Sequence, residues 1–132
     1  MPDNDSAVVA GGSKAAAISN LTVRLLTRYT GRGPTKARTY FNEDIVTVVL
    51  QDTLTKGEVT LVERNRAEVV LETRKTFQEV MGDELVAGIE EILGRKVRAF
   101  LSANHVEPDI AVETFILHPA GRSDDGRSDD GA

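Results

Sequence analysis

The chain has 132 residues, enough for one domain with a modest hydrophobic core and too few for two. It contains no cysteine, which excludes disulfides, thiolate zinc sites and cysteine nucleophiles. The formal net charge is −5, but most of it lies at the two ends, and residues 14–119 are nearly neutral. No apolar run approaches the roughly 20 residues that span a bilayer. No signal-peptide pattern opens the chain, so we expect a cytoplasmic protein.

Both ends of the chain are polar and are predicted to be disordered. Residues 1–12 combine Pro, Asp, Asn and paired Gly, and residues 120–132 contain the sequence Gly-Arg-Ser-Asp-Asp twice. Neither segment can bury enough apolar surface to offset the entropy cost of ordering it. The repeated tail is interpreted as a solvated end, with an interaction tail as the alternative. We therefore predict a single domain over residues 13–119.

The first predicted element is a helix that Ser13 can cap and that extends to about Thr30. Its apolar residues fall at three- and four-residue spacing and form one face. They are Ile18, Leu21, Leu25 and Tyr29. Gly31 is expected to end the helix in the left-handed conformation, and Arg32-Gly33-Pro34-Thr35 predicts a tight turn.

Two further regions have the composition of strands. Residues 44–51 are apolar almost throughout, as expected for a strand at the centre of a sheet or one covered on both faces. Tyr40 and Phe41, just before it, are expected to enter the core. Near the end of the chain, residues 97–104 and 110–117 flank the polar turn Val-Glu-Pro-Asp and predict a β-hairpin.

Between these strand regions the chain is predicted to be helical. Thr55 and Glu58 have the spacing of a capping box, so a helix should begin at Lys56. After a break near Asn65, an apolar face resumes and continues to Gly94. The residues expected on that face are Val69, Val70, Thr73, Phe77, Val80, Met81, Leu85, Val86, Ile89, Ile92 and Leu93.

The element order is therefore α-β-α-α-β-β. It predicts an α+β, two-layer domain in which helices pack on one face of a three-stranded mixed sheet. The first strand reaches the second through a helical crossover, so these two are expected to be parallel, with the third strand antiparallel to both. Such a sheet leaves two free edges, which favour pairing across a two-fold axis, and we predict a homodimer.

The segment from Lys14 to Phe41 holds six basic residues and no acidic one. The predicted binding surface, called the basic helix–loop surface below, consists of Arg24, Arg28, Arg32, Gly33, Lys36 and Arg38. Its charges either pair with acidic residues of the fold or dimer, or bind a small anion or an acidic protein surface, or bind nucleic acid. The short patch, its few aromatic residues and the acidic chain argue against nucleic acid. The segment from Gly31 to Lys36 is not a P-loop, because it follows a helix and lacks the P-loop spacing.

The predicted hairpin turn is the second candidate site. Its polar residues are Ser102, Asn104, His105, Glu107, Asp109 and Glu113, and the predicted site consists of Ser102, Asn104, His105 and Asp109. His105 near a carboxylate could hold a metal or act as a general base. However, Asn, Asp and Pro also occur in turns for conformational reasons, and the other histidine, His118, lies at the far end of the returning strand. We therefore predict no catalytic residue, no metal site and no cofactor.

Several segments together resemble a known family. They are Ile18–Tyr29 with the Gly-x-Gly-Pro-Thr-Lys-Ala-Arg-Thr-Tyr run to Tyr40, Arg74-Lys75-Thr76-Phe77, Gly94–Phe100, and Pro108–Glu113 with Phe115. Over about residues 13–119 the chain is similar to the MpsC-like family, small bacterial proteins named as a component of a sodium-translocating, membrane-potential-generating system. The resemblance carries no set of catalytic residues. It implies an accessory partner of a membrane sodium or bicarbonate transport system, in which another chain performs the translocation.

These observations predict a non-enzymatic cytoplasmic accessory module. We expect it to contact a partner protein or a small anion through the basic helix–loop surface, and to do so without inserting into the membrane. The expected partners are a second copy of the chain and a membrane-transport protein. One alternative is a small ligand- or metal-dependent enzyme that uses His105 and Asp109, and a second is a weak nucleic-acid binder.

Overall fold

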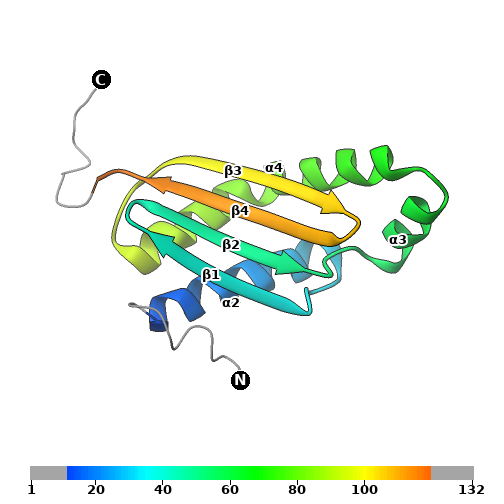
Figure 1. The fold of residues 1–132 in the computed structure, drawn as a ribbon. Coiled ribbons are helices and arrows are strands. Elements are labelled where there is room, and N and C mark those ends of the chain that lie inside the picture. Colours follow the sequence, from blue (N-terminus) through cyan, green and yellow to red (C-terminus); the bar gives the residue numbers. More distant parts are fainter. Residues whose placement is uncertain (1–11, 120–132) are drawn as a thin grey trace.

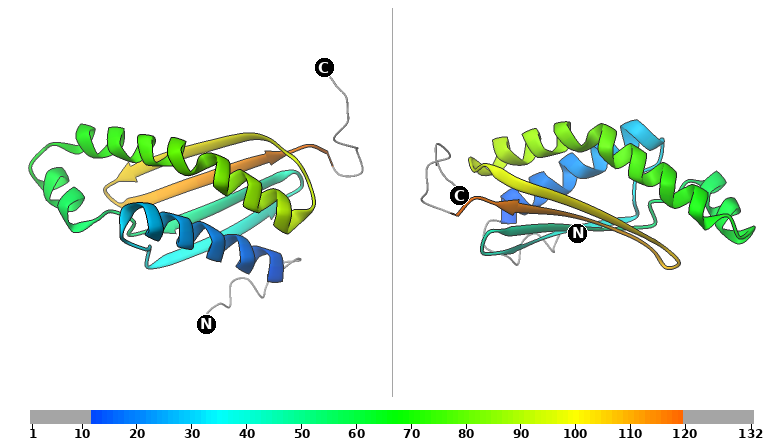
Figure 2. Two further views of the ribbon diagram at one scale, coloured as in Figure 1. Left: turned by 180° about the vertical axis from the view of Figure 1, so that it is seen from behind. Right: turned by 90° about the horizontal axis from the view of Figure 1, so that it is seen from above.

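The computed structural model describes residues 12–119, which form a layer of strands and a layer of helices (Figures 1 and 2). The elements are α2 (Gly12–Thr30), β1 (Lys36–Asn42), β2 (Ile45–Gln51), α3 (Lys56–Glu63), α4 (Ala67–Leu93), β3 (Val97–Val106) and β4 (Asp109–Leu117). The predicted tails, residues 1–12 and 120–132, lie outside the described residues, apart from Gly12, which begins α2. A single domain over residues 13–119 stays a prediction.

The α+β class is confirmed, but the prediction of a three-stranded mixed sheet is wrong. The sheet has four strands in the order β1-β2-β4-β3, and every neighbouring pair is antiparallel. The additional strand is β1, which follows the predicted turn at residues 32–35. Of the two residues expected to enter the core, Phe41 packs against it, but Tyr40 is 46 % exposed on the other face of the strand. β1 lies at the edge of the sheet and alternates charged with buried positions, so it lacks a continuous apolar run. Because β4 lies between β2 and β3, the two strands joined by the helical crossover do not pair.

Several helix boundaries follow local signals in the sequence, but Ser13 does not cap α2, because that helix already includes Gly12. The Thr55 hydroxyl accepts a hydrogen bond from the Glu58 amide (3.2 Å), and the Glu58 carboxylate accepts one from the Thr55 amide (2.8 Å). This capping box confirms the predicted helix start at Lys56. Asn65 separates α3 from α4 with a φ of 63°, and Gly94 ends α4 in the left-handed conformation.

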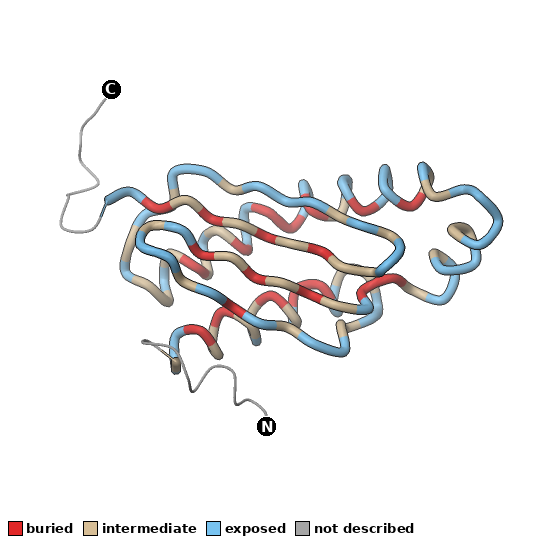
Figure 3. The backbone as a smooth tube through the Cα atoms, viewed as in Figure 1, coloured by how far each residue is buried: buried red, intermediate tan, exposed pale blue. Residues whose placement is uncertain are grey.

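The hydrophobic core lies between the sheet and the two long helices, α2 and α4. Its principal residues are Ile18, Leu25, Leu26, Val46, Val48, Leu50, Met81, Leu85, Ile89, Phe115 and Leu117. Along β2 and β4, buried residues alternate with partly exposed ones, as Figure 3 shows. Since side chains of a strand point alternately to its two faces, the helices cover one face of the sheet only. The right-hand view of Figure 2 shows the other face open.

The first half of α4 turns a face toward the sheet that differs from the predicted one. Arg74 and Gln78 are buried there together with Val70, whereas Val80, predicted to lie in the core, is 58 % exposed. α3 has no buried residue and projects beyond the end of the sheet (Figures 1 and 3). In this part of the molecule, polar side chains of α4 are therefore buried. They and the residues that hydrogen-bond to them form the candidate site.

Candidate functional site

Arg74 is a buried arginine that joins three elements. Its guanidinium donates to both oxygens of the Glu58 carboxylate, at 2.6 and 3.1 Å, and to the Thr53 carbonyl oxygen at 2.5 Å. Arg74 is 1 % exposed, and Glu58 is also the acidic member of the α3 capping box. The planar guanidinium suits such a two-pronged bond to a carboxylate. This pair holds α3 and the segment after β2 against α4.

Glu113 is the second buried ionisable residue of this region. On β4 it faces α4, and its two carboxylate oxygens accept hydrogen bonds from the Ser102 hydroxyl (2.5 Å) and the Gln78 amide (3.2 Å). The side-chain amides of Gln78 and Asn104 form two hydrogen bonds with each other. Gln78 Nε2 donates to Asn104 Oδ1 at 3.1 Å, and Asn104 Nδ2 donates to Gln78 Oε1 at 2.9 Å. Burial raises the pKa of Glu113 to about 7, against the opposing effects of the two hydrogen bonds and of the Arg74 charge.

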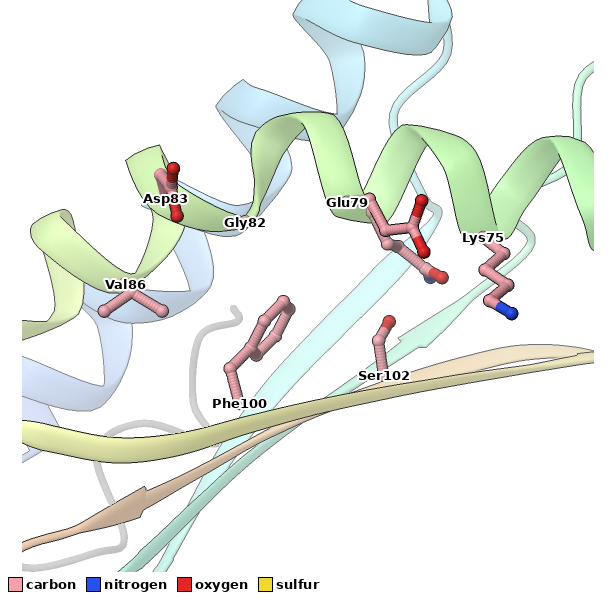
Figure 4. A pocket seen from close by; sticks show the side chains of 8 residues that line it. Lys75, Glu79, Gly82, Asp83, Val86, Phe100 and Ser102 are labelled. Carbon is pink, nitrogen blue, oxygen red and sulfur yellow. The ribbon is translucent and has the colours of Figure 1, made fainter.

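An open pocket of about 410 Å³ lies beside this network, between α4 and β3 (Figure 4). Its lining residues are Lys75, Gln78, Glu79, Gly82, Asp83, Val86, Phe100 and Ser102. Phe100 stacks on the buried Phe115 with ring centroids 5.1 Å apart, so its ring is fixed as part of the wall. A volume of this size is within the range of small-molecule sites.

The structure divides the four residues of the predicted hairpin site between two faces of β3 and the start of β4. Ser102 and Asn104 face α4 and belong to the Glu113 network. His105 lies on the opposite face, with Nδ1 2.8 Å from the Pro108 carbonyl oxygen. Asp109 accepts hydrogen bonds from the Leu54 amide (2.9 Å) and the Thr53 hydroxyl (3.2 Å), which fixes the chain that enters α3. Within residues 12–119, no three His, Asp or Glu side chains are grouped so that they could hold a metal ion.

The basic helix–loop surface is distributed around the edge of the sheet formed by β1. On α2, Arg24 is exposed and Arg28 forms an exposed ion pair with Glu84 of α4 at 2.8 Å. The hydrogen bond from the Tyr29 hydroxyl, followed by that from Arg28, lowers the pKa of Glu84. Arg28 is thus paired with an acidic residue of a later helix. This is the internal charge pairing that the sequence analysis gives as one interpretation of the surface.

The loop and strand residues of the surface lie nearer the open face. Arg32 donates from Nε to the Asp52 carbonyl oxygen (3.1 Å). At Gly33 a Cβ would come within 2.7 Å of the Thr27 hydroxyl oxygen, so the loop passes tightly against α2. Lys36 and Arg38 point to the open face of the sheet, where they line a small pocket of about 130 Å³. The residues lining it are Lys36, Arg38, Tyr40, Val49 and Gln51.

The open face of the sheet is an apolar surface that the sequence pattern did not predict. Its apolar residues are Tyr40, Ile45, Val49, Ala99, Leu101, Ala103, Ile110, Val112 and Ile116. Three of these are prominently exposed: Ile45 at 40 %, Tyr40 at 46 % and Leu101 at 56 %. The strand residues that alternation directs to this side include the basic Lys36 and Arg38 and no acidic residue. The missed signal was the alternation in β1, which adds the fourth strand and its two cations.

The comparisons with known proteins give one finding. A family model described as "Na+-translocating membrane potential-generating system (MpsC)" matches residues 11–119. The comparisons with curated proteins and with solved structures give no significant match. Between residues 12 and 119, no helix has both the length and the apolar character needed to cross a membrane.

Proposed function

This chain belongs to the MpsC family, and from that premise we propose that it is an accessory protein of a Na+-translocating, membrane-potential-generating system. Its role in this proposal is to bind an acidic segment of a partner protein in that system. The observation that carries the proposal is the open face of the sheet, where Lys36 and Arg38 stand beside exposed apolar side chains.

The chemistry of the open face favours a partner that is both acidic and apolar. The pocket between Lys36 and Arg38 is about 130 Å³, a size suited to a single carboxylate group and its immediate neighbours. Val49, next to Arg38 in the register, and Val112 beyond it continue the surface as an apolar row. A carboxylate at the cations and apolar side chains along that row would be complementary in charge and polarity. A free small anion would also match the two cations in charge, but it would leave the apolar row exposed to water.

The other residues of the basic helix–loop surface fit the same proposal in a different role. Arg32 and Gly33 precede β1, and Arg24 and Arg28 lie on the adjoining helix α2. Arg24 and Arg32 would raise the local concentration of an acidic partner through their long-range field, whereas Arg28 is paired with Glu84 and adds little to it. Contact would be made at Lys36 and Arg38. The proposal is therefore of a binding module, with no reaction assigned to it.

Charge reversal at the open face should abolish partner binding. We expect Lys36→Glu/Arg38→Glu to weaken binding at least tenfold, because two attractions become repulsions within one pocket. The probes are synthetic peptides that tile the water-exposed segments of the membrane subunits of the host's sodium system. Affinity is measured by fluorescence anisotropy, and free acetate is included to represent a small anion.

The matched control is Arg64→Glu/Arg66→Glu, which makes the same change of charge at two exposed residues between α3 and α4. It should bind the peptides like the unaltered protein. The proposal fails if no acidic peptide binds, if the open-face variant binds as well as the control, or if acetate alone competes at the concentration of the peptides.

We also propose that the predicted homodimer forms through the outer edge of β3. Among residues 12–119 no strand pairs with that edge, and beyond the bulge between Val97 and Ala99 β3 carries neither the lysine nor the proline that commonly protects an edge strand. Leu101→Lys should give a monomer in native mass spectrometry, since a lysine on an edge strand opposes pairing with a second copy. Tyr40→Lys, at an exposed position on β1, should leave a dimer. A monomeric unaltered protein at micromolar concentration would contradict the proposal.

A further inference from the structure

The pocket between α4 and β3 combines an apolar wall with a polar end. Gly82 and Val86 of α4 lie opposite Phe100, and a Cβ at Gly82 would come within 3.3 Å of the Phe100 ring. Glycine at this position therefore leaves the pocket as open as the backbone allows. Toward the N-terminal half of α4, Lys75 and Ser102 form the polar end (Figure 4). The pocket thus suits a small molecule with a short apolar body and one polar group.

The Ser102 hydroxyl determines what that polar group must be. A serine hydroxyl has one hydrogen to donate and two lone pairs that accept. In this structure the hydrogen is directed to Glu113, whose carboxylate accepts from Ser102 on one oxygen and from Gln78 on the other. The lone pairs of Ser102 are therefore left for the pocket, because this exposed residue also lines it. The wall consequently presents an acceptor, and it suits a ligand that donates.

The charges around the pocket specify a cation as that donor. Glu79 and Asp83 are exposed lining residues on α4, and the Glu113 carboxylate lies directly behind Ser102. Lys75 is the lining residue of opposite sign, and its exposed, flexible side chain can turn toward solvent. Arg74 cannot replace a ligand cation at Glu113, because its guanidinium is engaged by Glu58 and Thr53.

We infer that this pocket binds a small organic cation, a protonated amine with a compact apolar body, whose N–H groups donate to Ser102 while Glu113 supplies the countercharge behind it. The apolar body lies on Phe100 and Val86. This ligand site is separate from the open face of the sheet and does not depend on the function proposed for that face.

Binding of the cation is linked to the protonation of Glu113. The groups that face Glu113 are Arg74 on α4, with Lys75 and Glu79 at the pocket, and Glu58 on α3 through its bond to Arg74. On the neighbouring strands its cross-strand partners are the uncharged Val48 and Ser102. With a pKa of about 7, Glu113 is mostly ionised at pH 8 and mostly protonated at pH 6. When it is protonated, its own hydrogen can be donated to Ser102, and the countercharge is lost.

The test is a nuclear magnetic resonance titration of the full chain with benzylamine, which is a cation throughout this pH range. We expect the amide signals of Gly82, Phe100 and Ser102 to shift and saturate, with a Kd about tenfold weaker at pH 6 than at pH 8. Benzoate, with the same ring and the opposite charge, should not saturate these signals. Lys75→Met should tighten benzylamine binding several-fold, because it removes the opposing charge.

Glu113→Gln is the decisive variant. It should bind benzylamine as weakly at pH 8 as the unaltered protein does at pH 6, with no dependence on pH, and dispersed amide signals will show that it is folded. The inference is overturned if benzylamine shifts no pocket signal at millimolar concentration, if benzoate binds as well, or if the pH dependence survives in Glu113→Gln. It is also overturned if Lys75→Met weakens binding, since the pocket would then select an anion.

Discussion

Replacing Arg74 with alanine should lower the free energy of unfolding by about 3–5 kcal/mol, the usual cost of removing one partner from a buried ion pair. The substitution leaves the carboxylate of Glu58 without its cation at a site where that side chain is 12 % exposed. It also leaves the Thr53 carbonyl oxygen without the donor that now bonds it. Because α3 has no buried residue of its own, it should detach from α4 before the rest of the domain unfolds. Urea unfolding followed by circular dichroism measures the change.

Two further variants separate the buried charge from the loss of side-chain volume. Arg74→Met combined with Glu58→Gln should recover part of the stability that Arg74→Met loses alone, because glutamine can keep the capping box and no buried charge is left unpaired. Arg66→Ala is the matched control, since it removes an exposed arginine from its ion pair with Glu68 and should cost less than about 1 kcal/mol. A loss below about 1 kcal/mol for Arg74→Ala would show that the buried pair does not secure α3.

Glu113 should make the protein less stable as the pH rises from about 5 to about 7. Its pKa is raised from 4.5 to about 7 in the folded state, so the folded protein holds this proton more tightly than the unfolded chain. Below pH 4.5 both states are protonated, and no cost arises. Well above pH 7 both are ionised, and the buried charge costs the folded state about 3 kcal/mol, from about 1.4 kcal/mol for each unit of pKa.

Glu113→Gln should remove this dependence, because glutamine has nearly the same size and no charge. The difference in free energy of unfolding between the variant and the unaltered protein should therefore change by about 3 kcal/mol between about pH 4.5 and about pH 7.5, in favour of the variant at the higher pH. The difference is the quantity to measure, since other carboxylates affect both proteins alike. Glu91→Gln, at an exposed position of α4, serves as the control for charge alone. A constant difference across this range would refute the assignment to Glu113.

The amino-acid sequence by itself determined the features that depend on neighbouring residues. The capping box at Thr55 and Glu58, the left-handed Gly31 and Gly94, and the break at Asn65 all follow from interactions within a few positions of the chain. The family was also recognisable from segments distributed along the chain, and the match over residues 11–119 confirms it.

The fourth strand could not be found from the local pattern. β1 is an edge strand in which Lys36 and Arg38 alternate with smaller or buried residues, and its turn into β2 has Glu43 at a φ of 55° where glycine or asparagine would be the usual signal. Without β1, the apolar run in β2 and the hairpin gave three strands and a parallel pair. The place of β4 between β2 and β3 depends on pairing between residues about 65 positions apart, such as Val48 and Glu113.

Ser102 and Asn104 were candidates from the sequence, but only the tertiary structure placed them beside the buried residues of α4. Helical periodicity assigned Val80 to the core because apolar spacing was the only available signal, yet the folded helix turns Arg74 and Gln78 inward. Polar residues can occupy those positions because Glu58 and Glu113 come from other elements to meet them. A buried polar group is stable only when its partner is present, and the sequence of one helix contains no information about a partner supplied by a distant strand.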